Sequence, residues 1–176
     1  SPRARGRPRR SGDRADLAAQ KARADAEKLV GFLIEDFYAE LEPTGRLEIM
    51  GQLANLAVEY YDGLPPDLVT PQTQAYRGMA LIRAGGAMLA GDRIEEGARS
   101  VQQAREVFTQ LRASGDTSEA TTLGMALALF TPYAAWGPGG APFSRPTDLP
   151  EAADLLRPLL DEPGSSPQVK IVYADI

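Results

Sequence analysis

The sequence of 176 residues contains no cysteine and no histidine. Without cysteine it can form no disulfide, thiolate nucleophile or cysteine-based zinc site, and its redox compartment is left open except that it needs no oxidation. Without histidine it lacks the Ser-His-Asp and Cys-His arrangements, the histidine zinc ligands and the commonest general base. We therefore expect no catalytic residue, no metal site and no cofactor, and hence no enzymatic activity in this chain.

Long apolar runs are also missing. No uninterrupted run approaches the roughly 18 residues that a membrane-spanning helix needs, and the N-terminus has no apolar stretch that resembles a secretory signal. The apolar fraction of 43% and the charged fraction of 24% are typical of an ordinary soluble globular protein. We expect a folded protein in the cytoplasm.

Positive charge is scarce outside the N-terminus. Residues 1–14 carry six arginines and one aspartate, a net +5, so the remainder of a chain of net charge -5 sums to -10. Because phosphate contacts need a basic face, the body is not expected to bind nucleic acid. The arginine-rich tip itself has three interpretations: contact with anionic lipid beside a membrane, an inert linker, or a nucleic-acid contact, which ranks third because no aromatic residue is interleaved with the arginines.

The sequence divides into three segments. Residues 1–13 contain one apolar residue, Ala4, and are expected to be a disordered Arg-rich arm. Residues 14–42 are predicted to form one long helix, Ala-rich and solvated in its first half and buried in its second, with Pro43 ending it. Residues 43–176 are predicted to be a helical repeat region, cut short at its C-terminal end. The apolar rows of the long helix are Leu29, Leu33, Phe37 and Leu41 beside Val30, Ile34 and Tyr38.

Turn and capping residues place further helices within residues 43–176. Thr44 is expected to cap a helix from about Arg46 to Gly63, and Thr70 with Pro71 a third helix that ends at Gly91. A fourth helix follows Asp92 and ends before Gly115. Capping boxes are predicted from Asp116 with Glu119 and from Asp148 with Glu151; Pro132 should kink or end the fifth helix, and Pro158 should interrupt the sixth. The last run, residues 167–176, fits either a strand or a helix, and a helix is favoured.

These helices predict an all-α fold of antiparallel hairpins stacked as a tetratricopeptide-like (TPR-like) α-solenoid. The first helices of successive pairs are expected near Gln72, Thr117 and Pro167, which gives steps of 45 and 50 residues. A tetratricopeptide repeat is about 34 residues long. The predicted period is therefore irregular and longer than the standard one.

Two segments resemble the linker of large bacterial multidomain signalling proteins. They are AEKLVGFLIEDFYAELEPTGRLEIM and LANLAVEYYDGLPPD, and together they cover Ala26 to about Asp67. In those proteins an apolar helix, the pattern L-E-P-x-G-R-L and a second helix ending in two aromatic residues lead into tetratricopeptide-like repeats. Here the pattern is matched by Leu41, Glu42, Pro43, Gly45, Arg46 and Leu47.

The resemblance implies a connection between an N-terminal effector and a repeat array. The effector of such proteins is a protein kinase, a nucleotide cyclase, a nucleoside-triphosphatase or a death- or immunity-type domain, often with a membrane helix shortly before the linker. The resemblance also implies that the arginine-rich tip lies beside a membrane in the full-length protein. The match weakens after the turn at Ala90, Gly91 and Asp92, so no binding residue of the family carries over to this chain.

The remaining candidates for chemistry have ordinary structural explanations. Lys21, Lys28 and Lys170 are the only lysines, and the first two lie on the solvated half of the long helix, which favours a structural role over a nucleophilic one. The carboxylates Glu35, Asp36, Glu40 and Glu42 do not converge as a catalytic pair, because neighbouring residues on a helix point about 100° apart.

Glycines and aromatics raise two further questions. Gly85 with Gly86 and the run Gly137 to Gly140 lack the lysine and spacing of a phosphate loop, so we interpret the first pair as a close helix contact and the second as a loop. Tyr133, Trp136 and Phe143 either form an exposed anchor for a partner or cover the end of the fifth helix, and the second reading is favoured.

The leading functional hypothesis is a non-enzymatic module that binds or positions a protein partner or a neighbouring domain of the same polypeptide. The alternative is that this chain is the regulatory region of a larger enzyme, a protein kinase or a nucleotide cyclase, whose catalytic domain lies outside it. A third option is homodimerisation through the Ala-rich half of the long helix, whose heptad signal is poor. The sequence does not decide the oligomeric state.

Overall fold

The computed structural model describes residues 10–32 and 46–176, and all the regular elements of these residues are helical. This confirms an all-α fold for the described part of the chain. The α-helices are α1 (Arg10–Phe32), α3 (Leu47–Asp62), α4 (Pro71–Ala90), α5 (Ile94–Ala113), α6 (Glu119–Trp136), α7 (Asp148–Leu156) and α8 (Pro167–Asp175), and two 3-10 helices are η3 (Pro66–Leu68) and η4 (Arg157–Asp161).

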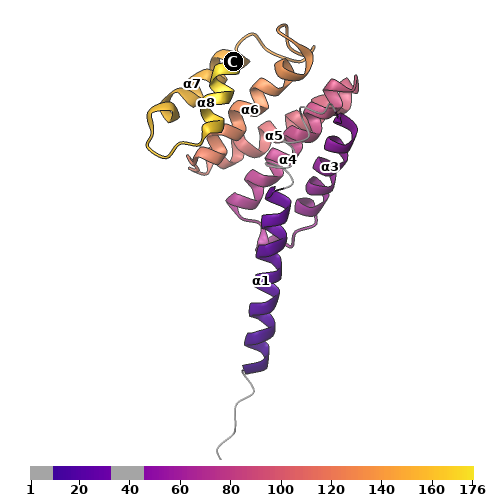
Figure 1. Cartoon of the computed structure of the whole chain (residues 1–176), viewed down its shortest axis with the longest axis vertical. Coiled ribbons are helices and arrows are strands. Elements are labelled where there is room, and N and C mark those ends of the chain that lie inside the picture. The colour runs from indigo at the N-terminus through magenta and orange to yellow at the C-terminus, as the bar shows by residue number, and fades with distance from the viewer. Residues whose placement is uncertain (1–9, 33–45) are drawn as a thin grey trace, which may run out of the picture.

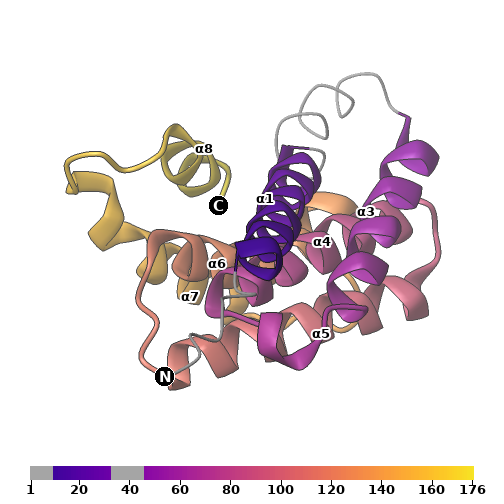
Figure 2. The ribbon, with the colours of Figure 1, turned by 90° about the horizontal axis from the view of Figure 1, so that it is seen from below.

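Helix α1 is a stem that projects from the body of the molecule (Figure 1). Its side chains from Gly12 to Ala22 are all exposed. Nearer its C-terminal end, a guanidinium nitrogen of Arg23 donates to the Leu68 carbonyl at 3.0 Å, and Val30 packs against the core. Seen from below, α1 points towards the reader in front of α4, with α3 and α8 to either side (Figure 2). The stem is therefore attached by its last turns.

The N-terminal boundaries differ from those expected. Helix α1 begins at Arg10 rather than Arg14. Leu29 is 59% exposed, which corrects the expectation that its apolar row is buried. Residues 1–9 and 33–45, which include most of the predicted arm, the rows from Leu33 to Leu41 and the predicted cap Thr44, lie outside the described residues.

The body is a stack of helices in which each packs on the next. Helices α3 to α7 contact one another in chain order, and α4 also packs against α6. One buried apolar cluster includes residues from every α-helix from α3 to α8, among them Tyr61, Met79, Phe108, Leu129 and Val169. This shared core follows from amphipathic helices that bury their apolar faces against each other.

Local signals place α4 and α5 where the sequence predicts them. Thr70 caps α4: its hydroxyl accepts the Thr73 N–H at 3.1 Å, while the Thr73 hydroxyl accepts the Thr70 N–H at 2.8 Å. Pro71 follows as the first helical residue, where its missing N–H costs nothing. Gly115 closes the turn after α5 with a φ of +91°, a conformation that favours glycine.

The two predicted capping boxes are wrong. The N-cap of α6 is Ser118, whose hydroxyl accepts the Thr121 N–H at 3.3 Å, and Glu119 bonds to another helix. Asp148 is not a cap but the first residue of α7, with a fully buried side chain. A capping box depends on local backbone geometry, and both acidic residues have longer-range partners here.

The C-terminal part confirms two expectations and corrects a third. Residues 167–175 form a helix, α8, as favoured over a strand. Helix α7 gives way to η4 around Pro158, as expected for an interrupted helix. Of the two outcomes expected at Pro132, an end of the helix is wrong, because α6 continues to Trp136 with the proline buried inside it; a kink stays a prediction.

The buried proline explains a long-range polar network. Because Pro132 has no N–H, the carbonyl of Ala128 one turn earlier loses its usual helical donor. Arg105 of α5 supplies the replacement, with its Nε donating to the Ala128 oxygen at 3.2 Å. The same guanidinium pairs with the buried Asp148 carboxylate at 3.0 Å, so α5, α6 and α7 are linked through one arginine.

The first helices of the pairs repeat at a constant interval. The steps between the starts of α4, α6 and α8 are both 48 residues, not the 45 and 50 expected, because the helices start at Pro71, Glu119 and Pro167. The residue before each start is a serine or threonine, the preferred N-cap types. These residues are Thr70, Ser118 and Ser166.

A sequence pattern also recurs around the ends of α3, α5 and α7. It consists of an alanine, a large apolar residue four positions later and a leucine three positions after that. All nine residues are buried except Leu64, which is half-buried and packs on the core. The three sets are Ala57, Tyr61 and Leu64; Ala104, Phe108 and Leu111; and Ala152, Leu156 and Leu159.

Candidate functional site

The candidate site is a groove of about 630 Å³ at the N-terminal ends of the first helices. A hollow of this size is within the range of ligand-binding pockets. Its floor is apolar, and its rim carries hydroxyl, carboxamide and carboxylate groups. It is lined by Pro71, Gln72, Ala75, Tyr76 and Met79 of α4, by Ser114, Gly115, Asp116 and Ser118 of the α5–α6 turn, by Ala120 and Leu123 of α6, and by Gln168 of α8.

Equivalent positions of the repeat supply much of this lining. Gln72, Ala120 and Gln168 lie 48 residues apart and all line the groove. Three residues further along, Ala75 and Leu123 form part of its floor. Their counterpart in α8 is Ile171, which is 60% exposed. The groove is therefore lined by positions at the same distance from the starts of α4, α6 and α8.

Phe108 fixes the spacing of the helices behind the groove. Its fully buried ring comes from α5 and lies between Gly78 of α4 and Gly124 of α6. A Cβ atom at Gly124 would lie 2.2 Å from the Phe108 Cζ atom, and one at Gly78 would lie 2.6 Å from it. Glycine at both positions lets the ring fill the space between α4 and α6, the two helices that form most of the groove floor.

A turn built around Asp116 forms one end of the groove. One carboxylate oxygen accepts the Ser118 N–H at 2.9 Å, and the other accepts the Thr121 hydroxyl at 2.8 Å. The hydrogen bond from the Ser118 backbone, with the side chains of Ser118 and Thr121, lowers the pKa of the Asp116 carboxyl below its usual value. This end of the groove therefore carries a negative charge at neutral pH.

A second carboxylate holds α8 in place. Both oxygens of Glu119 accept the Ser166 N–H, at 3.3 and 3.1 Å, and one also accepts the Ser165 hydroxyl at 3.2 Å. Hydrogen bonds from Ser166 and Ser165 lower the pKa of Glu119. Since a carboxylate is favourable beside a helix N-terminus, Glu119 ties the start of α8 to the start of α6 and positions Gln168 at the groove.

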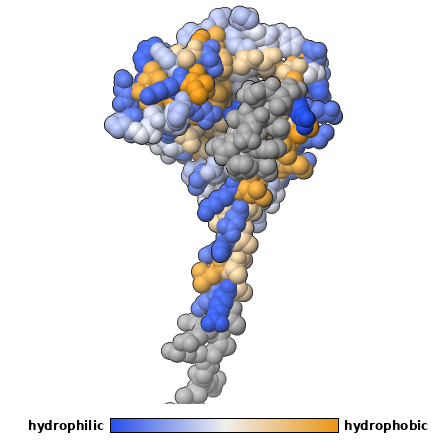
Figure 3. Space-filling model, in the orientation of Figure 1, coloured by the Kyte–Doolittle hydropathy of each residue, from blue (hydrophilic) through white to orange (hydrophobic). Residues whose placement is uncertain are grey.

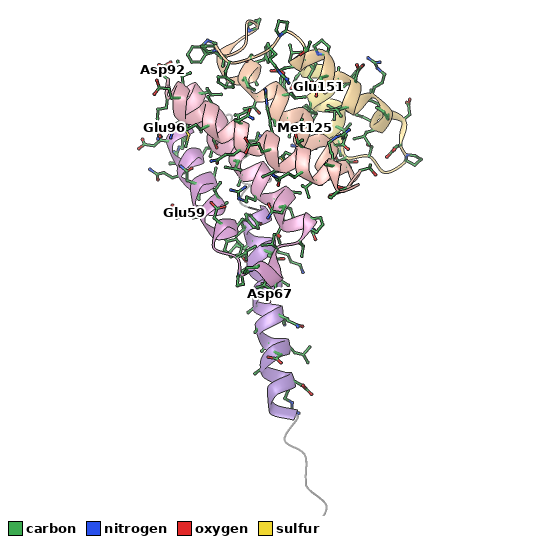
Figure 4. The ribbon with its side chains drawn as sticks, turned by 180° about the vertical axis from the view of Figure 1, so that it is seen from behind. Glu59, Asp67, Asp92, Glu96, Met125 and Glu151 are labelled. Carbon is green, nitrogen blue, oxygen red and sulfur yellow. The ribbon has the colours of Figure 1, made fainter. Side chains whose placement is uncertain are left out.

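The predicted candidates for chemistry do not converge here. Lys21 and Lys28 are exposed on α1, and Lys170 is exposed on α8. The carboxylates Glu35, Asp36, Glu40 and Glu42 lie outside the described residues. In residues 10–32 and 46–176, no group of three or more acidic side chains is placed to hold a metal ion. Figure 4 shows acidic residues of the body spread over separate elements.

The glycine interpretation is confirmed. Gly85 faces α5, where an added Cβ would lie 2.8 Å from Val101 and 3.2 Å from the Gly97 carbonyl, so these glycines allow α4 and α5 to approach closely. Gly86 faces α6, with Thr131 at 3.2 Å from its added Cβ. Residues 137–140 form part of the loop between α6 and α7.

The three aromatic residues near the end of α6 do not form one exposed anchor. The Tyr133 hydroxyl donates to the Arg145 carbonyl at 2.7 Å, and Phe143 packs against a small buried cluster with Leu89 and Val101. Only Trp136 of the three is substantially exposed, at 40%. Tyr133 and Phe143 therefore cover the helix end, as favoured from the sequence.

Figure 3 shows hydrophilic and apolar side chains side by side along the projecting part of α1, and apolar patches among hydrophilic surface in the upper left, where α7 and α8 lie. Among the described residues, no helix combines the length and the apolar character that crossing a bilayer requires.

The fold and the groove define the class: in its described part this is an all-helical chain that lines one groove with residues of α4, α6, α8 and the α5–α6 turn. Comparison with protein-family models, with curated proteins and with solved structures finds no match. The resemblance to linkers of bacterial signalling proteins therefore remains an expectation from the sequence.

Sequence analysis predicted none of the groove residues. The signal was present in the caps Thr70, Ser118 and Ser166, which stand at equal intervals. Counting from these caps, instead of from the predicted capping box at Asp116, gives the repeat and so the shared face of the first helices.

Proposed function

We propose that this chain is a non-enzymatic protein-interaction module, a TPR-like stack of helical pairs that holds a segment of a partner protein or of a neighbouring domain in its groove. The observation that carries the proposal is the use of equivalent repeat positions, Gln72, Ala120 and Gln168, along one groove. Helical repeat arrays bind through such extended concave surfaces.

The composition of the groove supports binding rather than chemistry. The chain contains neither histidine nor cysteine, and the groove offers apolar side chains with a few hydrogen-bonding groups around them, of which Asp116 is charged. An apolar floor with a few polar groups is the usual character of a recognition site. The resemblance to signalling proteins supports a role in positioning their effector or its partner, at the cytoplasmic side of a membrane.

Site-specific photocrosslinking tests the proposal. Benzoylphenylalanine replaces Gln72, an exposed residue at the groove rim, or Gln103, an exposed glutamine of α5 outside the groove lining, in the full-length polypeptide expressed in cells. We expect discrete crosslinks from position 72 that disappear when Ala120→Trp fills the groove, and none of these products from position 103. Identical products from both positions, or none from position 72, would contradict a binding groove.

A further inference from the structure

The groove has one ionised end and no compensating cation. Asp116 is the only ionisable carboxylate among the described residues that line it, and no lysine or arginine lines it in the described part of the chain. The hydrogen bonds from Ser118 and Thr121 keep the Asp116 carboxylate charged by lowering its pKa. Asp116 is half-buried at the rim, so its charge is felt within the groove.

Two helix ends lie beside Asp116. At the start of α6, Asp116 accepts the Ser118 N–H and the Ser118 hydroxyl accepts the Thr121 N–H. Helix α5 ends at the same place, next to Ser114 and Gly115. A helix C-terminus carries a partial negative charge, so it adds to the potential of Asp116.

The remaining surface suits a chain in extended conformation. The floor consists of apolar side chains, Ala75, Met79 and Leu123, while the rim offers the carboxamides of Gln72 and Gln168. A carboxamide both donates and accepts hydrogen bonds. It can therefore pair with the main chain of an extended segment, whose N–H and C=O groups are free, but not with the satisfied main chain of a helix.

Resting on the proposed function, we propose that the groove binds an extended segment of a partner protein in which apolar side chains stand next to a lysine or arginine. The apolar side chains occupy the floor, and the cation lies against Asp116. The chain's own N-terminal segment, residues 1–13, is basic but has no large apolar side chain. It could therefore supply the cation for Asp116 but not the apolar side chains for the groove floor.

Fluorescence anisotropy with designed peptides tests the inference. The probes are fluorescein-labelled ten-residue peptides with a central Leu-Ser-Leu, glycine and serine elsewhere, and lysine, alanine or glutamate placed either before or after the leucines. We expect the better lysine peptide to bind about tenfold tighter than its alanine counterpart at low salt, and the glutamate peptide more weakly than both. The advantage of lysine should shrink as salt screens the charge.

Three variants locate the binding. Asp116→Asn should bring the affinity for the lysine peptide down to that for the alanine peptide. Ala120→Trp should abolish binding of both, because it fills the groove from an exposed position. Ala134→Trp is the matched control, since Ala134 is an exposed alanine of the same helix outside the groove lining, and it should bind like the unmodified chain.

The inference is overturned if the glutamate peptide binds as tightly as the lysine peptide, if Ala134→Trp weakens binding as much as Ala120→Trp, or if none of the peptides binds. It is also overturned if a peptide of residues 1–13 binds as well as the lysine peptide, because attraction between charges alone would then suffice. If the inference fails while the crosslinks from position 72 are retained, the proposed function still stands, with a partner of other chemistry.

Discussion

At the scale of single residues, Phe108 depends on the absence of two side chains. Its ring occupies the space left by Gly78 and Gly124 on facing helices. Alanine normally stabilises a helix by about 1 kcal/mol relative to glycine. At Gly78 or Gly124 an alanine would instead destabilise the fold. Its methyl group would force the buried Phe108 ring to shift, and the cost of this overpacking exceeds the gain in helix propensity.

Gly124→Ala is therefore expected to lower the free energy of unfolding by about 2–3 kcal/mol, as overpacked cores do. Urea denaturation followed by circular dichroism measures it. The matched control is Gly51→Ala in α3, where the added Cβ would lie 3.4 Å from Ala87, an ordinary contact, so helix propensity should leave stability unchanged or slightly higher. A Gly124→Ala protein as stable as the control would show that Phe108 is not confined.

Asp148 is the second residue on which the stability of the fold depends. Its side chain has no exposed surface, and burial alone would raise its pKa. The Arg145 N–H at 3.0 Å and the guanidinium groups of Arg105 and Arg145 outweigh that effect, so the pKa is lowered. Removing one partner of a buried ion pair costs about 3–5 kcal/mol because the other charge is left unpaired. We expect a loss of this order in Asp148→Ala, measured by urea denaturation at pH 7.

The lowered pKa of Asp148 also predicts the direction of a pH effect. A carboxyl group with a lower pKa in the folded state stabilises the fold above its unfolded pKa of about 4, and this contribution is lost as the pH falls through the folded value. The unmodified chain should therefore lose more stability between pH 7 and pH 3 than Asp148→Asn does. Asp67→Asn, which changes an exposed carboxylate, should retain the full loss. If all three proteins lose the same free energy of unfolding between pH 7 and pH 3, the pH effect does not come from Asp148.

At the scale of elements, α8 is held by hydrogen bonds at its start and by one apolar face that packs on the core. Glu119 accepts hydrogen bonds from Ser165 and Ser166, and two buried valines, Val169 and Val172, join the core. The rest of this short helix exposes Lys170, Ile171 and Ala174. Its stability should therefore depend on the carboxylate more than that of α4 or α5, which are buried along their length.

Glu119→Ala should detach α8 without unfolding the body. Hydrogen exchange followed by mass spectrometry should show protection falling about tenfold or more in residues 167–175 and little change in α4 and α5. Glu106→Ala, on the exposed face of α5, serves as the control and should leave α8 protected. Equal loss of protection throughout the chain would mean that Glu119 stabilises the whole fold instead.

Local chemistry decided which elements the sequence could predict. The start of α4 depends on Thr70 and Pro71, which act within one turn, so it was predictable. The roles of Asp148 and Pro132 depend on Arg105, which lies 43 residues from Asp148 in the chain, and no local pattern indicates such a partner. The groove was missed for a related reason, because it appears only when three helices are counted from their true starts.

At the scale of the whole molecule, a compact body carries a stem whose first turns add little to it. The side chains from Gly12 to Ala22 are exposed, whereas Arg23 and Val30 contact the body. An isolated helix of about 12 residues is marginal in water. The exposed part of α1 therefore contributes little to the stability of the fold.

Deleting residues 1–22 should change the free energy of unfolding of the body by less than about 0.5 kcal/mol, as expected for surface changes. Adding Arg23→Ala to the truncated chain should loosen the rest of α1, seen as faster hydrogen exchange in residues 24–32. A large loss of stability on truncation alone would show that the stem is buried against something in solution, such as a second copy.

The proline in α6 makes the two complete helical pairs dependent on each other as building blocks. Residues 71–118 supply the arginine, Arg105, and residues 119–166 supply its acceptors, the Ala128 carbonyl and the Asp148 carboxylate. Asp116 of the first unit likewise accepts the Thr121 hydroxyl of the second. An engineer who lengthens this stack should duplicate the two pairs as one block, because a copy of the first alone would leave its guanidinium without a carboxylate, and a copy of the second alone would arrive with an orphaned acceptor and an uncompensated charge.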